Sequence, residues 1–596
     1  MDRGGHHYDY TRLVAQAAVD LGIQPVVAAN RKLTNSVRQD FQQFGNVHNV
    51  FRRSTYTPFS HLAGLKELAA GSQPDKTNKL LKRPEDAKGL LANWQANRAR
   101  QKRIKQRGRI IRNFAQDCDT LFSKAGLQDT DQVFFTTVSE LEFMGLAAFL
   151  SDQPGTMAAT WHVQFHFSMF TGRTAEFVRQ TKAEGQITGC FQHALSRAPY
   201  HEIRTYTTSD ELAEQYNTMQ LMAFASLPYP INPRLFCDRK AERQTGPLRM
   251  AVTGGVRREK GQKSQVTKVL SEIWDKHIAT GNLKVDLQTS KPGSFPGKGS
   301  LDSSQVSAKQ LREHVNILPH PLPDDQYVQL IEDASFGLFC YDSRRYFARR
   351  AGIMGEFLAN GKPVIVPAGC WLANQLTEAN CQHVEKLMRQ TKAKQELDLS
   401  DLSCPRENVP QGGGIISFGK QRNPFVAWLE KDQISNEKTD AVVVQFQWRW
   451  PKKSGTFVEL DLICYDEQGE AITHDRQVVS MRGSQASSLV YLRTSSDFHR
   501  LKLRFRNAYM DSSLSLSDLR LTALDFGDNP TPPRSAVGVV AADQAGVIAA
   551  IDEMVQHYDH YRSTAIEFSR DWISGHDPQR TVATLMPSTK TRRRAA

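Results

Sequence analysis

The chain of 596 residues lacks several features that would assign it to a common class. It contains no run of about 18 uncharged apolar residues, so the sequence predicts no membrane-spanning helix. The N-terminal segment MDRGGHHYDYTRLV has no apolar core followed by a small-residue cleavage site, and we expect no secretory signal peptide. A GxxxxGK[ST] phosphate loop is also missing, which excludes that type of nucleotide site.

The eight cysteines are scattered along the chain and form no CxxC pair. This spacing argues against a zinc site and against a disulfide framework. We therefore expect reduced thiols and a cytoplasmic protein.

The formal net charge of +13 predicts an anionic partner, such as nucleic acid, an anionic membrane surface or a phosphorylated small molecule. Eight basic residues and no acidic residue lie between Arg98 and Arg112. Ile104, Ile111, Cys118 and Ala125 recur every seven residues there, which indicates an amphipathic helix with a basic outer face. The basic face is either solvated or in peripheral contact with an anionic membrane. Because no nucleic-acid-binding module is recognisable, we expect no nucleic-acid partner.

Up to about residue 385, apolar segments alternate with helical patterns, which predicts parallel sheets built from βαβ units. The expected strands are Gln24–Ala29, Asp131–Thr137, Ala158–Phe165, Leu248–Gly255, Leu283–Thr289, Val315–His320, Phe336–Tyr341 and Pro363–Ala368. Three prolines between Ala225 and Phe236 indicate a linker, after which a new series begins. We therefore predict two doubly wound lobes.

After about residue 395, apolar and polar residues alternate with period two, which predicts an antiparallel β-sandwich. The segment AVGVVAA and a long helix from Ala545 to Arg570 then return to the α/β pattern, so the sandwich is expected as an insertion. The predicted domains are an acceptor lobe (1–230), a nucleotide-sugar lobe (231–395), the sandwich (396–534), the end of the second lobe with a helix that crosses back (535–585) and a basic tail (586–596).

The segment LRMAVTGGVRREKG combines a strand, a glycine turn and the basic residues Arg257, Arg258 and Lys260. Free amide groups at the start of the following helix, together with these charges, suit a diphosphate. An ordinary strand-to-helix loop is the alternative.

A second segment of this kind follows the strand FGLFCY. Arginines that include Arg349 precede a helix beginning near Ala351–Gly352, and small residues there allow an anion to approach the helix amides. Glu356, one turn further on, is placed to accept two hydroxyl hydrogen bonds, as a ribose diol would offer. A solvated helix residue is the alternative for Glu356. Both segments follow strands, where ligands of open α/β sheets bind.

The N-terminal part of the chain has two candidate features. Gly4–Gly5 precede an apparent helix and form either a tight turn or a close approach to a substrate. His162 and His166 lie at the end of a buried strand, where contact with a sugar and a hydrogen-bonded core position are both open. Their spacing of four would suit a metal on a helix, but the strand pattern and the missing third ligand argue against one.

Taken in order, these motifs resemble the GT-B glycosyltransferases, most closely the retaining enzymes similar to family 4 (group 1). The motifs are GGHHYDY, GGVRREKG, LPHPLPDDQY, RRAGIMGEFLANGKPVIVPAG and GVVAADQAGVIAAI. The resemblance implies an α/β fold with two Rossmann-like lobes facing across a cleft, here with an inserted antiparallel β-sandwich. It also implies retaining transfer of a sugar from a nucleotide-diphosphate sugar to a glycan, lipid-linked or other acceptor, as in polysaccharide biosynthesis. Neither a cofactor nor a metal is expected.

The resemblance also assigns roles to residues. Cations would bind the diphosphate, helix amides would approach it, Glu356 would hold the ribose, and the first lobe would reach the donor sugar. It implies donor binding by Gly4, Gly5, Arg258, Arg349, Gly352 and Glu356, and catalysis by His162, His166, Arg257 and Lys260.

One departure from the family pattern concerns the first of two glutamates separated by seven residues, because Ala348 stands at its position. The alternative function is therefore a catalytically inactive GT-B-like protein that binds glycan or acts as an adaptor. In the sandwich, aromatic side chains serve either as stacking rings for carbohydrate or as core residues. These side chains are Trp448, Trp450, Tyr465 and Tyr491.

Overall fold

The computed structural model describes most of the chain in two compact units. The described residues are 6–52, 85–128, 131–153, 159–168, 181–227, 229–237, 246–256, 260–261, 263–295, 307–391, 393–397, 416–418, 425–434, 438–449, 456–481, 485–495, 497–507 and 514–586. Gly4, Gly5, Arg257, Arg258 and Trp450, and the predicted tail from residue 587, lie outside the described residues.

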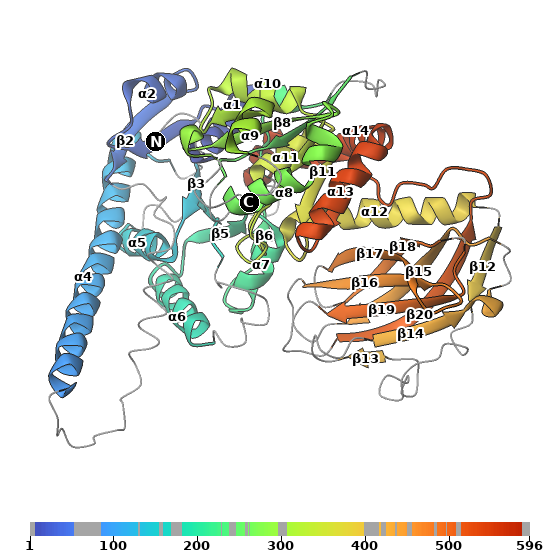
Figure 1. Cartoon of the computed structure of the whole chain (residues 1–596). Helices are drawn as coiled ribbons and strands as arrows, with labels where there is room; N and C mark the ends of the chain where they lie inside the picture. Colours follow the sequence, from blue (N-terminus) through green and yellow to red (C-terminus); the bar gives the residue numbers. More distant parts are fainter. Residues whose placement is uncertain are drawn as a thin grey trace, which may run out of the picture. The chain divides into compact units, whose positions relative to one another are not determined.

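The first unit, Met1–Thr171, Glu176–Pro230 and His576–Ala596, contains a four-stranded parallel sheet in the order β3-β4-β5-β6 (Figure 1). A separate pair of parallel strands is formed by β1 and β2. The strands are β1 (Val26–Asn30), β2 (Asn46–Phe51), β3 (Gln132–Val138), β4 (Thr160–Phe165), β5 (Glu202–Thr207) and β6 (Phe224–Ser226). The helices are α1 (His6–Asp20), α2 (Asn35–Gln42), α4 (Glu85–Ala125), α5 (Glu140–Ser151), α6 (Thr181–Arg197), α7 (Asp210–Asn217) and α15 (Pro578–Leu585).

The basic segment Arg98–Arg112 lies within the long helix α4 (Figure 1). Its buried side chains include Ile110, Phe114, Cys118 and Leu121, which recur every three to four residues as in an amphipathic helix. The buried stripe therefore passes through Ile110, whereas the sequence predicted Ile111. In the part of the chain that the structure describes, none of the helices has the length and apolarity of a bilayer-spanning segment.

The second unit contains a six-stranded parallel sheet with the order β21-β11-β10-β7-β8-β9. Its strands are β7 (Leu248–Val252), β8 (Leu283–Thr289), β9 (Val315–Pro319), β10 (Phe336–Leu338), β11 (Val364–Pro367) and β21 (Gly538–Ala541). In order along the chain these are strands one to six, so the sheet has the 3-2-1-4-5-6 order of a doubly wound nucleotide-binding fold. The prediction of parallel sheets is confirmed.

Helices bury both faces of this sheet. One core cluster contains Met250 and Leu338 with residues of α8, α9 and α13, and a second contains Ala251 and Val364 with residues of α10, α11, α12 and α14. The helical elements are η3 (Pro233–Leu235), α8 (Lys263–Glu272), η4 (Trp274–Ile278), η5 (Pro292–Ser294), α9 (Ala308–His314), α10 (Asp324–Asp333), α11 (Gly352–Ala359), α12 (Trp371–Gln390), α13 (Gln544–Gln556) and α14 (Tyr558–His576). Because both faces are covered, most residues of β7, β8, β10 and β11 are buried.

Two local predictions differ from the structure. The predicted long helix from Ala545 to Arg570 is two helices, α13 and α14, separated at His557, where the backbone leaves the helical region at φ −117°. The predicted linker Ala225–Phe236 includes the end of β6, because Ala225 and Ser226 pair with β5 and continue the first sheet.

The strands between α12 and β21 form antiparallel sheets in two layers (Figure 1). One has the order β12-β20-β15-β18 with β13 beside β20, and the other has the order β14-β19-β16-β17. The strands are β12 (Ala393–Leu397), β13 (Ile416–Phe418), β14 (Phe425–Glu430), β15 (Ala441–Arg449), β16 (Thr456–Tyr465), β17 (Ala471–Met481), β18 (Gln485–Arg493), β19 (Arg500–Asn507) and β20 (Leu514–Asp525). A short helix, η8 (Lys431–Gln433), follows β14.

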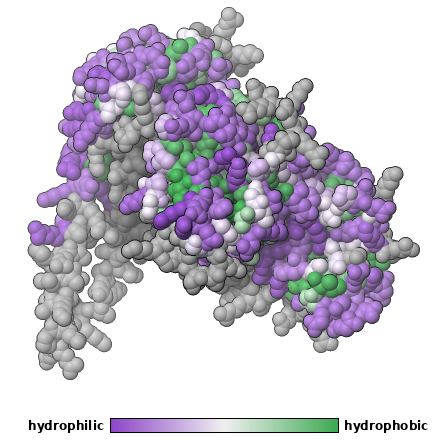
Figure 2. All heavy atoms as spheres, turned by 45° about the horizontal axis from the view of Figure 1, so that its top comes forward, coloured by the Kyte–Doolittle hydropathy of each residue, from purple (hydrophilic) through white to green (hydrophobic). Residues whose placement is uncertain are grey.

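Alternate side chains of these strands form one apolar core, as Leu460 and Leu462 of β16 show. Trp448 and Tyr491 are each only 1% exposed. Trp448 lies in this core, Tyr491 lies in a second cluster that includes Val384 of α12, and Tyr465 is half-buried. The face drawn in Figure 2 is mostly hydrophilic, with scattered hydrophobic areas. Among the described residues, the exposed large apolar side chains are Val19, Leu21, Val26, Tyr200, Ile472 and Met586.

Candidate functional site

The candidate site lies where the direction of winding of the six-stranded sheet reverses. From β7 the chain winds outward through β8 and β9, and then returns to β10 on the other side of β7. Connections that leave neighbouring strands in opposite directions open a crevice at the carboxyl ends, where ligands of such sheets bind. The segments that follow β7 and β10 contain both sets of residues that the sequence analysis selected.

The glycine turn after β7 brings the backbone close to a cation. Gly254 and Gly255 have φ values of +88° and +68°, which favour glycine. The amide of Gly254 donates a hydrogen bond to Gln288 Oε1 at 2.9 Å. A Cβ atom at Gly254 would lie 2.9 Å from Lys260 Nζ and 2.8 Å from the Tyr341 hydroxyl oxygen. The turn therefore packs directly against Lys260 and Tyr341.

Lys260 is half-buried and lies over an aromatic ring. Its ammonium nitrogen is 5.5 Å from the centroid of the Tyr341 ring, within the range of a cation–π contact. Tyr341 is 5% exposed and follows β10 closely, so its ring holds the lysine at the switch point. Tyr341 was not selected from the sequence, although its position at the end of a predicted buried strand could have identified it as a site residue.

Glu356 lies on α11 and is half-buried. The Tyr327 hydroxyl group on α10 donates a hydrogen bond to its Oε2 atom. Burial raises the pKa of Glu356, although the Tyr327 bond and the charges of Lys260 and Arg350 oppose this shift. The structure therefore brings Glu356 into the electrostatic range of Lys260, and the two predicted residues belong to one site.

The two arginines before α11 have different surroundings. The Arg349 guanidinium lies over the Tyr346 ring, 5.6 Å from its centroid. Arg350 lies 5.4 Å from the Trp371 ring centroid and 6.0 Å from that of Trp572. Sequence reasoning selected Arg349, but it is the charge of Arg350 that acts on Glu356.

The N-terminus of α11 begins at Gly352 and has no side-chain cap, because Ala351 occupies the N-cap position. Unsatisfied amides at such a terminus, with the positive end of the helix dipole, attract an anion. Gly352 is half-buried and lies one turn before Glu356, which agrees with the expected spacing.

The two predicted histidines of the first unit have different environments. His162 is 0% exposed, and its ring nitrogens bond to the Tyr206 hydroxyl at 3.2 Å and to Gln132 Oε1 at 2.9 Å. Burial, with a smaller effect of Arg204, lowers the pKa of His162 to about 4, so the ring is neutral near pH 7. This environment favours the core alternative for His162.

His166 follows the carboxyl end of β4 and is 7% exposed. Its Nε2 atom lies 3.1 Å from Gln164 Oε1, and its ring has an edge contact with Tyr10. His166 therefore keeps the strand-end position that the prediction requires, and its role stays a prediction. Among the described residues, no group of three or more His, Cys, Asp or Glu side chains is arranged to hold a metal.

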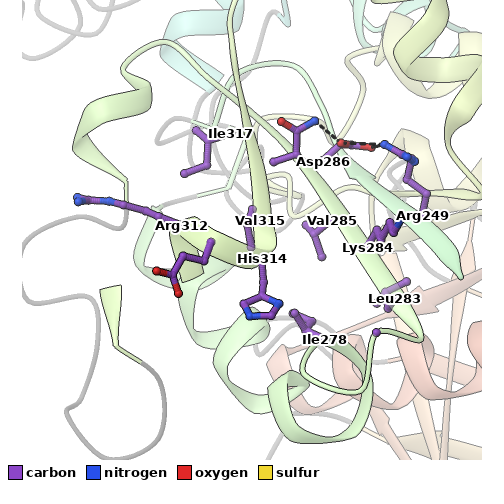
Figure 3. A pocket seen from close by; sticks show the side chains of 13 residues that line it. Arg249, Ile278, Leu283, Lys284, Val285, Asp286, Arg312, His314, Val315 and Ile317 are labelled. Carbon is purple, nitrogen blue, oxygen red and sulfur yellow. Dashed lines mark hydrogen bonds and ion pairs between the residues drawn. The ribbon is translucent and has the colours of Figure 1, made fainter. Parts of the chain in front are cut away.

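Another cavity, of about 630 Å³, lies along the amino-terminal halves of β7, β8 and β9 (Figure 3). There Asp286 accepts hydrogen bonds from Arg249 Nη1 at 3.1 Å and from Asn316 Nδ2 at 2.7 Å. Figure 3 shows Asp286 joined to Arg249 by dashed lines, with His314 and Ile278 at the opposite side. Since ligands of open α/β sheets bind at the carboxyl ends, we place the candidate site at the switch point and not in this cavity.

Comparison with known proteins gives distant structural similarity only. No family model and no curated protein matches the sequence. The chain is similar to the trehalose-6-phosphate synthase OtsA, with 12% identity over 63% of this chain and 82% of that chain and a TM-score of 0.36. It is similar to a glycosyltransferase from Rickettsia africae ESF-5, with 10% identity over 61% of this chain and 76% of that chain and a TM-score of 0.32. It is also similar to the CBM22-1 xylan-binding domain of Paenibacillus barcinonensis Xyn10C, with 10% identity over 23% of this chain and 89% of that chain and a TM-score of 0.16.

Proposed function

We propose that the protein is a glycosyltransferase that transfers a sugar from a nucleotide-diphosphate sugar to a glycan, lipid-linked or other acceptor with retention of configuration. The observation that carries the proposal is the convergence of Gly254, Lys260 and Tyr341 at the switch point, with Glu356 within range of the lysine charge. This set combines a close backbone approach, a cation and a carboxylate, which are the groups that a nucleoside diphosphate requires.

In this proposal the diphosphate lies against the glycine turn and Lys260. The N-terminal amides of α11 at Gly352 face the same charge, and Arg349 is a further phosphate partner. Glu356 accepts hydrogen bonds from the ribose hydroxyls, with Tyr327 holding the carboxylate in place. Arg257 and Arg258 belong to the same loop in the sequence and add positive charge there.

Departure of the diphosphate is the step that these cations assist. The bond between the sugar C1 atom and the phosphate oxygen breaks, a bond from C1 to the acceptor oxygen forms on the same face, and the acceptor proton passes to the leaving phosphate. Lys260 and the arginines stabilise the negative charge that develops on the phosphate. Since side-chain cations supply this charge, the proposal includes no metal. The roles in donor binding for Gly4 and Gly5 and in catalysis for His166 stay predictions from the family resemblance.

The first test is a thermal shift experiment with UDP, GDP and ADP on the full chain. At least one nucleotide is expected to raise the melting temperature, and Glu356→Ala and Lys260→Ala are expected to reduce that shift. Lys268→Ala is the matched control, because Lys268 is an exposed lysine on α8. No stabilisation by any nucleotide would refute the proposed function, and an unchanged shift in both site variants would refute the proposed site.

A second candidate function rests on Ala348, which is 1% exposed and occupies the position of the first glutamate of the family pattern. A small apolar side chain there removes a group that would contact the donor sugar, which favours a catalytically inactive glycan-binding or adaptor protein. Nucleotide binding separates the two functions, because an adaptor has no use for a diphosphate site.

A further inference from the structure

A second cavity lies beside the candidate site, at the carboxyl ends of β10, β11 and β21. It has a volume of about 330 Å³, within the range of about 300–1,000 Å³ that is typical of small-molecule sites. Gly261 and Tyr341 line it, so it adjoins Lys260 and the glycine turn. Phe457, from β16 of the sandwich, also lines it. The cavity is therefore formed jointly by the α/β sheet and the sandwich.

Direct contacts attach the sandwich to this edge of the sheet. The amide of Gly369, after β11, donates a hydrogen bond to Ser480 Oγ on β17 at 3.1 Å. Arg476 Nη1 on β17 donates to Asp543 Oδ2 at 2.8 Å, and Asp543 follows β21 and caps α13. Arg476 Nε also contacts Asp461, whose side chain is fully buried. These bonds hold β17 at the carboxyl ends of β11 and β21, and Phe457 on the neighbouring β16 is paired with Ser480, so the fold keeps Phe457 at the cavity.

The lining of the cavity is amphiphilic. Phe457 is half-buried and offers an aromatic surface. Cys340 adds an apolar wall, because burial raises the pKa of its thiol to about 12 and keeps it protonated near neutral pH. Asp342, Ser343 and Gln265 supply polar groups, and the Asp342 carboxylate is oriented by a bond from the Arg344 amide at 3.0 Å. A sugar ring matches this combination, since it has apolar C–H faces and a rim of hydroxyl groups.

We propose that this cavity binds a saccharide ring and that Phe457 makes the sandwich a wall of the substrate site. The choice of a saccharide rests on the proposed function, whereas the location rests on the cavity and on the contacts of the sandwich. The ring belongs either to the donor or to the acceptor. In both cases the ligand in the cavity is a hexose-sized sugar.

Two binding measurements on the full chain separate these sources. Isothermal titration compares UDP, GDP and ADP with UDP-glucose, GDP-mannose and ADP-glucose, and saturation-transfer NMR follows free glucose, mannose and galactose. The variants are Phe457→Ala, which removes the aromatic wall, and Phe457→Trp, which narrows the cavity. Ile463→Ala is the matched control, because Ile463 is a half-buried apolar residue of the same strand outside the cavity lining.

We expect the sugar-dependent part of binding, which is the affinity for free sugar or the gain of a nucleotide sugar over its bare nucleotide, to weaken by at least about tenfold in both Phe457 variants. It should stay unchanged in Ile463→Ala. Affinity for the bare nucleotide is expected to be the same in all four proteins, which shows that the variants are folded. Weaker binding of a nucleotide sugar by the Phe457 variants assigns the cavity to the donor. Weaker binding of the free sugars alone assigns it to the acceptor. Nucleotide binding with no sugar-dependent part, or with one that is insensitive to Phe457, overturns this inference and leaves the proposed function intact. No nucleotide binding at all overturns the proposed function, and the free-sugar measurement then decides the role of the cavity by itself.

Discussion

The hydroxyl group of Tyr327 donates a hydrogen bond to the carboxylate of Glu356 and so connects α10 to α11 beside the switch point. The bond orients an acid whose pKa is raised by burial. A carboxyl group that is easier to protonate in the folded than in the unfolded protein destabilises the fold wherever it is ionised. Such a cost is expected of a group retained for binding, and it can be measured.

Replacing Glu356 by Gln is therefore expected to raise the melting temperature of the ligand-free protein at pH 8. The gain in melting temperature over the parent protein should decrease as the pH falls. It should vanish below the unfolded pKa of about 4.3, where the glutamate is protonated in both the folded and the unfolded state. The same substitution is expected to weaken nucleotide binding, because an amide donates on one side and cannot accept both ribose hydroxyls. Thermal denaturation between pH 4 and pH 8, with and without nucleotide, checks both effects.

Glu378→Gln serves as the control for this experiment, because Glu378 is an exposed glutamate on α12. Its melting temperature should follow that of the parent protein at every pH. A Glu356→Gln variant that is less stable than the parent at pH 8 would contradict the raised pKa.

The elements that could be predicted from the sequence are those whose local pattern decides the structure. The segment Leu283–Thr289 was predicted as a strand and is β8, because apolar and polar residues alternate along it with the period of a strand. By contrast, Asn46–Phe51 was not predicted, since its polar residues conceal β2 and its pairing with β1 is a tertiary contact. Sequence periodicity does not report such pairing.

The candidate site also combines residues that local motifs predict with residues that only the tertiary structure brings together. Lys260 and Glu356 were selected from local motifs, and the fold brings their charges within range of each other. Their partners Tyr327 and Arg350 were not selected, because which side chain packs against a helix depends on the crossing of α10, α11 and α14, which no local pattern specifies. The cavity beside Phe457 is less predictable still, since the α/β sheet and the sandwich form it together.

Replacing Gly254 by Ala is expected to disrupt the proposed phosphate site. The positive φ of Gly254 costs an alanine about 1–2 kcal/mol, and the new Cβ would meet Lys260 Nζ and the Tyr341 hydroxyl inside contact distance. We expect lower stability together with at least about tenfold weaker nucleotide binding. Isothermal titration and chemical denaturation measure the two effects separately.

Gly281→Ala is a matched control in the same unit, because Gly281 has φ +75° and a Cβ atom there would meet no other atom within 4 Å. It should lose a similar free energy of unfolding and keep full nucleotide affinity. Equal losses of affinity in both variants would show that backbone strain, and not displacement of Lys260, causes the effect.

Trp448 is expected to stabilise the sandwich and to take no part in carbohydrate stacking. It is 1% exposed, lies in the sandwich core, and donates a hydrogen bond from Nε1 to Ser488 Oγ at 3.0 Å. Trp448→Ala should lower the free energy of unfolding by about 3–5 kcal/mol, because it leaves a large cavity. Tyr465→Ala, at a half-buried position, should cost much less. Equal stability of Trp448→Ala and the parent protein in urea denaturation would disprove the core assignment.

Asp461 is expected to make the sandwich sensitive to acid. Its fully buried side chain is bonded to His474 Nε2 at 2.8 Å, to Arg504 Nε at 2.9 Å and to Arg476 Nε at 3.1 Å. Burial alone would raise the pKa of Asp461, but the bonds from His474 and Arg504 and the charge of Arg506 outweigh it and lower the pKa. A lowered folded pKa means that the stabilisation is present above the unfolded pKa of about 3.9 and is lost as the pH falls through the folded value.

Asp461→Asn should therefore cost about 1–3 kcal/mol at pH 7, because it leaves buried donors without their charged acceptor. The difference from the parent protein should decrease as the pH falls below about 4, where the carboxylate becomes protonated in the unfolded protein, and should vanish as the pH falls through the lowered folded pKa. Asp432→Asn, at an exposed position in η8, should leave the pH profile unchanged. Urea denaturation at pH 7, 5 and 3 measures the three proteins, and a cost for Asp461→Asn that is independent of pH would show that the side chain acts by its shape and not by its charge.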